Sequence, residues 1–249
     1  MERQDYLKVT QLLDFENICL IQLVETRGWR DLSEYDRIGA IYNFVRNEIV
    51  LGYNQSDAMP ASQVLQDGYG QCNTKSILLM ALLRSCNIAC RLHGCTVHKR
   101  LQKGVITGIA YRLGPREIIH SWVEVAHRDR WISLEGVILD TAYLQALQQR
   151  FPNVGDSFCG YAVATSQFKT PPVDWCGEDT SIQKDAIIRD LGEFDSPDDF
   201  FAQYGVNLGG LKALLYRHVF RKRINLKVIS IRNNDPRLSE EFNPKKLST

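Results

Sequence analysis

Residues 68–94 read GYGQCNTKSILLMALLRSCNIACRLHG. Residues 77–83 are apolar almost all round a helical turn, which predicts a buried helix that begins at or beside Cys72. Gly68 and Gly70 allow the backbone to turn sharply just before that helix. Residues 88–97 then alternate and contain β-branched side chains, as a strand does. The segment therefore predicts a buried helix followed directly by a strand.

The residues on either side of this segment predict an α+β fold. On the N-terminal side, helical spacing predicts helices over residues 6–25 and 34–50, and a short turn over 61–66. On the C-terminal side, residues 118–126 and 130–138 predict the two strands of a hairpin around the polar turn HRDR. Helices followed by antiparallel strands are typical of α+β proteins. We expect residues 1–150 to form the core, and residues 151–249 a mostly helical extension docked on it.

Composition excludes several classes of protein. The 249 residues are 44% hydrophobic and 24% charged, so the chain is neither mainly disordered nor a small disulfide scaffold. No apolar run approaches the ~20 residues of a membrane span, and the first residues lack the apolar segment of a signal peptide. Seven cysteines are an odd number, which favours reduced thiols. We therefore expect a cytoplasmic protein with no membrane partner.

Charge is balanced overall but not along the chain. Residues 171–200 hold nine acidic and two basic residues, whereas residues 211–249 hold ten basic and three acidic ones. The formal charge is +1, so the domain as a whole lacks the basic character of a nucleic-acid binder. We expect the two segments to face each other and no nucleic acid to bind.

Three motifs carry candidate chemistry: Gly-Tyr-Gly-Gln-Cys-Asn at 68–73, His-Ser-Trp-Val-Glu-Val at 120–125 and Trp-Ile-Ser-Leu-Glu at 131–135. The dipole and free N–H groups at a helix start favour a thiolate, so Cys72 is a candidate nucleophile. His120 can accept the thiol proton and later protonate a leaving amine. A carboxylate is needed to orient the histidine, and the hairpin register places Glu135 nearly opposite His120.

The combination of these motifs resembles the transglutaminase-like superfamily of cysteine enzymes over about residues 35–140. That pattern is a Gly-x-Cys before a Leu-rich helix, then His-x-Trp-x-Glu and Trp-x-x-Leu-Asp. The resemblance implies a papain-like core, Cys72 as nucleophile, His120 as general base and an acyl group transferred at an amide bond. Glu135 stands where the family has Asp, and Asp140 is the alternative orienting residue. The oxyanion donors would be the Cys72 N–H and a side chain, for which Gln71, Gln66 and Tyr53 are candidates.

Hydrolysis and transamidation both fit the resemblance, and we favour an amidase or peptidase acting on a peptide, protein or small amide, without a cofactor. The alternative is an inactive relative that kept the fold as a binding module. An arylamine acetyltransferase would need Arg-Gly-Gly-x-Cys, which this chain lacks. A second cluster combines three cysteines and two histidines, but strand alternation separates its members, so we expect no metal site. These residues are Cys86, Cys90, His93, Cys95 and His98.

Overall fold

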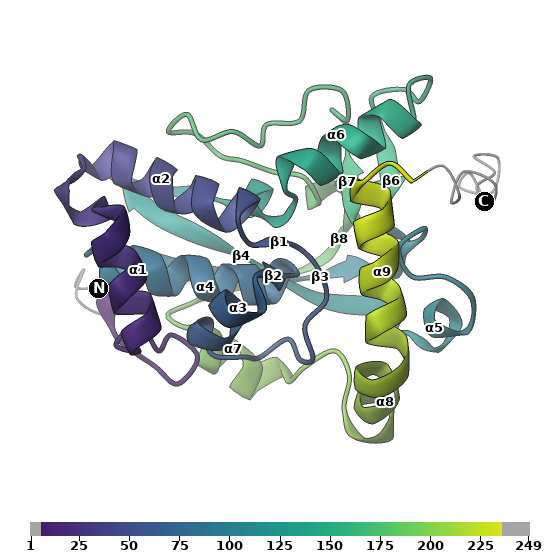
Figure 1. Ribbon diagram of the computed structural model, residues 1–249, viewed down its shortest axis with the longest axis horizontal. Coiled ribbons are helices and arrows are strands. Elements are labelled where there is room, and N and C mark those ends of the chain that lie inside the picture. Colours follow the sequence, from purple (N-terminus) through teal and green to yellow (C-terminus); the bar gives the residue numbers. More distant parts are fainter. Residues whose placement is uncertain (1–5, 236–249) are drawn as a thin grey trace.

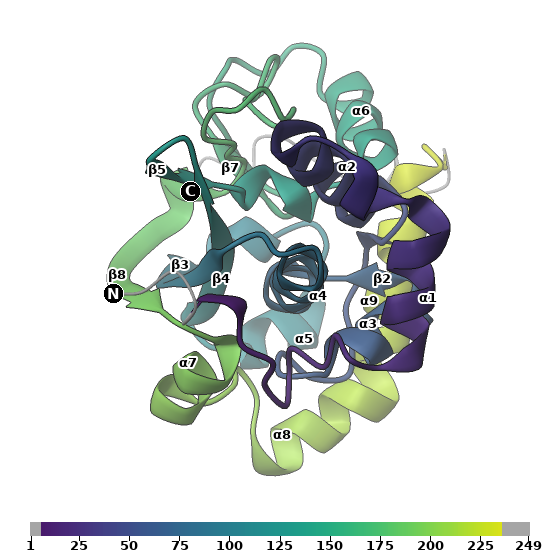
Figure 2. The same ribbon diagram turned by 90° about the vertical axis from the view of Figure 1, so that its left-hand side faces the viewer.

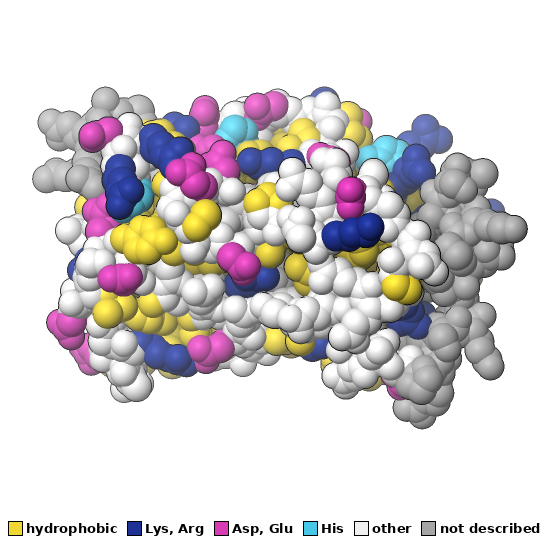
Figure 3. All heavy atoms as spheres, turned by 90° about the horizontal axis from the view of Figure 1, so that it is seen from above, with side chains coloured by type: hydrophobic (Ala, Val, Ile, Leu, Met, Phe, Trp, Pro, Cys, Tyr) yellow, Lys and Arg dark blue, Asp and Glu magenta, His cyan; other side chains and the backbone are white. Residues whose placement is uncertain are grey.

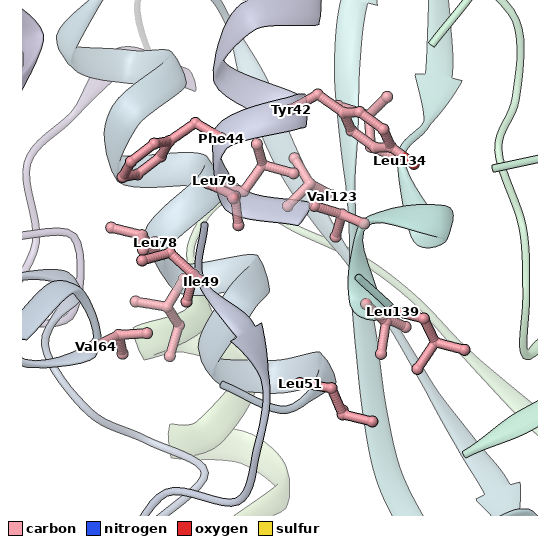
Figure 4. Packing of buried hydrophobic residues seen from close by; sticks show 14 of the residues in the cluster. Tyr42, Phe44, Ile49, Leu51, Val64, Leu78, Leu79, Val123, Leu134 and Leu139 are labelled. Carbon is pink, nitrogen blue, oxygen red and sulfur yellow. The ribbon is translucent and has the colours of Figure 1, made fainter. Parts of the chain in front are cut away.

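The buried helix is α4 (Cys72–Ser85), which lies at the centre of the molecule between a sheet and a layer of helices (Figure 2). Every residue from Asn73 to Arg84 is buried, as the apolar sequence predicts. The helix begins where Thr74 Oγ1 accepts a hydrogen bond of 3.0 Å from the Gln71 N–H, one half of a capping box. Figure 4 shows Leu79 of α4 between Phe44 and Val123, which come from the helical layer and the sheet.

The computed structural model describes residues 6–235. Its main sheet has the strand order β5-β4-β3-β8, with every neighbouring pair antiparallel. These strands are β3 (Cys90–His98), β4 (Glu117–His127), β5 (Arg130–Ser133) and β8 (Ile187–Phe194). The helices around them are α1 (Ile18–Arg27), α2 (Glu34–Asn47), α3 (Ala61–Asp67), α5 (Gly108–Leu113), α6 (Thr141–Arg150), α7 (Pro197–Tyr204), α8 (Gly210–Leu215) and α9 (Arg221–Arg232). The short strands are β1 (Val50–Leu51), β2 (Tyr69–Gly70), β6 (Phe158–Gly160) and β7 (Val163–Thr165). The α+β fold class expected from the sequence is confirmed.

The first predicted helix is shorter than expected. It starts at Ile18 instead of residue 6, because the Asn17 side chain accepts a hydrogen bond of 3.1 Å from the Cys19 N–H and so begins the helix there. Leu13 is nevertheless completely buried, in a loop. The apolar side chain of Leu13 is therefore explained by burial in the core, and it does not indicate a helix at this position.

The segment after residue 150 adds strands as well as helices to the fold. It contributes β6, β7 and β8 before its first α-helix begins at residue 197, and β8 is an edge strand of the main sheet. The charged residues Arg189 and Asp190 interrupt the alternation of apolar and polar side chains that would have indicated this exposed strand in the sequence. Figure 1 shows α9, in yellow, beside α6. Ile224 and Val228 of α9 are buried in the same hydrophobic cluster as α4, so both parts of the chain share one core.

The acidic segment makes its ion pairs with the core. Arg46, Arg91 and Arg130 pair with Asp174, Glu193 and Glu178 respectively. Basic and acidic side chains are interspersed on the face in Figure 3. In the described part of the chain, no helix has the length and apolar character needed to cross a membrane.

Lys75 is an unusual residue of α4 because its side chain is completely buried. Its ammonium donates hydrogen bonds of 3.1 Å to the carbonyl oxygens of Arg46 and Ile138. Burial lowers the pKa of Lys75 to about 7; the charges of Arg46 and Arg232 act in the same direction and that of Asp140 opposes it. In the unfolded chain a lysine titrates near pH ~10.4. Between these two pH values the unfolded state binds more protons, so folding stability rises with pH.

We expect Lys75→Met to remove this pH dependence. The free energy of unfolding of the wild type, minus that of the variant, should rise by about 1 kcal/mol per pH unit from about pH 7.5 to about pH 9.5. Urea denaturation at several pH values measures this difference. Lys222→Met, on an exposed side chain, is the matched control and should show no slope. A constant difference for Lys75→Met would contradict the assignment.

Candidate active site

Cys72 and His120 come together although 48 residues separate them in the sequence. Cys72 is the first residue of α4 and is partly buried, whereas His120 lies on β4 with 1% of its surface exposed. Both line one cavity. His120 Nε2 lies 3.6 Å from Glu135 Oε1. Within the described residues, His120 Nδ1 has no hydrogen-bond partner within normal distance, so this nitrogen is available to the cysteine.

The electrostatics of the site favour a charged histidine. Burial by itself lowers the pKa of His120, because the imidazolium loses its hydration. The negative charge of the Cys72 sulfur and the hydrogen bonding and charge of Glu135 outweigh this effect and raise the pKa above the usual value of histidine. The arrangement therefore favours an imidazolium at His120, the state that a cysteine–histidine pair needs in order to hold a thiolate.

Glu135 reaches His120 by a route that differs from the expected one. Glu124 pairs with Ser133, so continuing the register would place residue 137, and not Glu135, opposite His120. The strand ends at Ser133, and Glu135 begins a 3₁₀ turn (Glu135–Ile138). The expectation of a continuous strand over 130–138 was therefore wrong, because the chain turns inward and the carboxylate approaches His120 from this turn.

The Glu135 carboxylate is held by backbone groups of a distant segment. Its Oε2 accepts hydrogen bonds from the N–H groups of Ile182 and of Gln183, the latter at 3.1 Å. This segment is anchored on β5, since the Thr180 N–H donates to the Ser133 carbonyl at 2.8 Å. Two donors on Oε2 leave Oε1 on the side of His120, 3.6 Å from Nε2.

Asp140, the alternative orienting residue, is occupied elsewhere. Its carboxylate accepts hydrogen bonds of 2.9 Å from the N–H groups of Leu51 and Tyr143, the second of which caps α6. It also pairs with Arg232 at 2.8 Å. Burial by itself raises the pKa of Asp140. The hydrogen bond and charge of Arg232 lower it by more, so the pKa is below its usual value. The structure gives this residue a structural role at the start of α6.

The three oxyanion candidates occupy different places. Gln66 is exposed on α3 and does not line the cavity. Gln71 lines it, but its Oε1 accepts a hydrogen bond of 2.8 Å from the Asn54 N–H and its Nε2 lies 3.4 Å from Asp57 Oδ1. Tyr53 also lines the cavity; burial, and then the charge of Cys72, raise the pKa of its hydroxyl, which therefore remains a protonated donor.

Asn73 is a site residue that our sequence analysis missed. Its Nδ2 donates to the Ile119 carbonyl at 3.1 Å, and its Oδ1 accepts from Ser121 Oγ at 2.9 Å. These bonds join the residue after Cys72 to both neighbours of His120, and so fix the distance between α4 and β4. The available signal was a polar residue at the start of an otherwise apolar, buried helix.

One group of side chains has the composition of a metal site. Ligand atoms of His93, Glu124 and Glu193 lie within 4.8 Å of one another. Glu124 already pairs with Arg91 at 2.7 Å and with His93 at 3.0 Å. The second nitrogen of His93 lies 2.8 Å from Asp190. Since these partners occupy the ligand atoms, the group forms an ion-pair network on the sheet.

A half-buried cysteine at a helix start, a buried histidine on the adjacent sheet and a carboxylate behind it define the architecture of the papain-like cysteine enzymes. Residues 26–136 match the sequence model of the transglutaminase-like superfamily. The resemblance to that superfamily, which the motifs indicated, is therefore confirmed over this segment.

Two further comparisons concern curated proteins and solved structures. No curated protein matches the chain. Among solved structures, a proposed cysteine protease from Cytophaga hutchinsonii is similar, with 11% sequence identity and a TM-score of 0.45. The match covers 78% of this chain and 47% of that protein, so this chain spans about half of its length.

Proposed function

We propose that this protein is a cysteine amide hydrolase that works through a thioester on Cys72. The observation that carries the proposal is the buried His120, which lies between the sulfur of Cys72 and the carboxylate of Glu135. A buried imidazolium has a chemical use beside a cysteine nucleophile, and it would be costly as a purely structural feature.

In the first half-reaction, the Cys72 thiolate attacks the amide carbonyl carbon and forms a C–S bond. The Cys72 N–H and the hydroxyl of Tyr53 stabilise the resulting oxyanion. The C–N bond then breaks, and His120 gives its proton to the departing amine. Glu135 holds the imidazole in position throughout both half-reactions.

In the second half-reaction, water attacks the thioester and His120 takes the proton of that water. The C–S bond breaks, the carboxylic acid leaves, and the thiolate–imidazolium pair returns. The net reaction adds one water to one amide and yields one acid and one amine. An amine in place of the water would give transamidation, and we favour hydrolysis.

Competitive alkylation tests whether Cys72 is an activated nucleophile. We expect limiting iodoacetamide to label Cys72 at least about tenfold faster than the exposed Cys159, and to do so already near pH ~6, because the imidazolium of His120 stabilises the thiolate. Peptide mass mapping of the seven cysteines over about pH 5 to pH 9 measures the rates.

His120→Ala is the informative variant, and it should remove the labelling of Cys72 at low pH. Comparable rates for Cys72, Cys19 and Cys159 in the wild type would instead favour a binding module that has kept the fold without catalysis.

A further inference from the structure

A cavity of about 400 Å³ opens onto Cys72 and His120 and extends beyond them. Its walls come from parts of the chain that are far apart in sequence: the strands around His120, α5 with the loop before it, and the helical segment from α8 to α9. Figure 1 shows α5, α8 and α9 at the same end of the molecule. The cavity is large enough to enclose a small-molecule ligand.

The cavity wall is mainly apolar. Side chains that contribute to it include Leu51, Leu101, Ile106, Ile118, Tyr216 and Ile224. Among the described residues that line it, Asp57 is the one carboxylate. That carboxylate already accepts hydrogen bonds from the Asn207 N–H at 3.0 Å and from Asn73 Nδ2 at 3.2 Å. Lys99, Lys212 and Arg217 also line the cavity, so the wall favours a hydrocarbon group over a cationic one.

The order of the chemical steps indicates which part of an amide occupies this space. The amine must leave before water enters, so its side of the site has to exchange with solvent. The acyl group stays bonded to Cys72 until hydrolysis, and Cys72 lies in the cavity wall. A mainly apolar cavity beside the sulfur thus suits the group that remains.

We propose that the acyl donor carries a linear hydrocarbon chain and that this cavity holds the chain while the acyl group is bonded to Cys72. The inference rests on the proposed function, since it takes Cys72 to be the nucleophile. Each methylene that enters an apolar pocket contributes about 0.8 kcal/mol, or about a fourfold gain in second-order rate constant, until the cavity is full.

A test that needs no turnover uses alkyl methanethiosulfonates from methyl to decyl. The Cys72 thiolate attacks the thiosulfonate sulfur, a disulfide with the alkylthio group forms, and methanesulfinate leaves. The attached chain then occupies the position of the proposed acyl chain. We expect the labelling rate of Cys72 to rise at least about 50-fold from methyl to octyl, relative to the exposed Cys159. A flat or falling series, or failure to label Cys72, would overturn the inference.

Matched variants locate the effect in the cavity. Ala213 lines the cavity, whereas Leu211 on the same helix does not and is 81% exposed. Ala213→Trp should slow octyl labelling about tenfold or more while leaving methyl labelling unchanged, because the indole fills space that the chain would occupy. Leu211→Trp should leave both rates unchanged. Equal effects of the two variants would argue against the cavity as the binding place.

Acyl p-nitroanilides from butanoyl to decanoyl separate this inference from the proposed function. Hydrolysis that depends on Cys72 but not on chain length would support the amide hydrolase and overturn the hydrocarbon chain. Chain-dependent labelling of Cys72 without hydrolysis of any anilide would support the chain in the cavity and contradict the hydrolase. Hydrolysis whose kcat/KM rises with chain length supports both.

Discussion

Replacing Cys72 by alanine is expected to lower kcat by about 10⁶-fold, the loss that follows removal of a nucleophile in enzymes with covalent intermediates. Without the sulfur no thioester can form, and the remaining backbone donors and His120 cannot replace it. The acyl p-nitroanilide that the wild type hydrolyses fastest is the substrate for this measurement. The fold should persist, because the thiol is only partly buried and the side chain becomes smaller by one atom.

Cys86→Ala is the matched control, since Cys86 lies at the other end of the same helix and is buried. It should keep its activity, although it removes a buried thiol. Thermal unfolding of both variants shows whether either loss of function comes from unfolding. A Cys72→Ala protein that keeps more than about one per cent of wild-type kcat would rule out the thioester mechanism.

Glu135→Gln should have the second-largest effect, a loss in kcat/KM of about 10³- to 10⁴-fold, by analogy with amide replacement of the acid in Ser-His-Asp enzymes. The two backbone N–H groups of Ile182 and Gln183 hold one oxygen, so the amide oxygen of the variant should stay there. Its NH₂ group would then face His120 Nε2 and donate to it. The imidazole proton would move to Nδ1, where the histidine can no longer accept a proton from Cys72.

The pH dependence of Cys72 alkylation distinguishes this positioning role from a merely structural one. Because Glu135 raises the pKa of His120, removing its charge should let that pKa fall, and labelling of Cys72 should begin at a higher pH than in the wild type. Glu193→Gln, on the exposed edge strand, should leave the profile unchanged. An unshifted profile in Glu135→Gln, with normal turnover, would remove Glu135 from the mechanism.

The elements that carry Cys72 and His120 could be predicted because their signals are local. Residues 77–83 are apolar almost all round a helical turn, which predicts a buried helix, and the observed helix starts at Cys72 as expected. The strand over 118–126 is β4 with one more residue at each end. Neither prediction needs knowledge of what the element packs against, since helical and strand periodicity are properties of adjacent residues.

Predictions that depended on contacts between distant residues were less accurate. Glu135 was placed opposite His120 by a strand register that does not continue beyond Ser133, although the carboxylate still lies beside the histidine. Asp140 could not be separated from it until its hydrogen bonds to Leu51 and Tyr143 were known. Whether Gln66 faces the cavity could be decided only once the orientation of α3 was known.

The sequence by itself determined the buried helix, the strand and the pair of chemical groups that they carry, because periodicity and residue chemistry act over a few neighbouring positions. Only the tertiary structure decided which carboxylate lies beside His120, since backbone N–H groups 47 and 48 residues away hold Glu135 in place. It also decided the shape of the cavity, whose wall combines residues from Leu51 to Ile224. No local pattern in the sequence predicts this cavity, because it forms only once the distant segments have packed together.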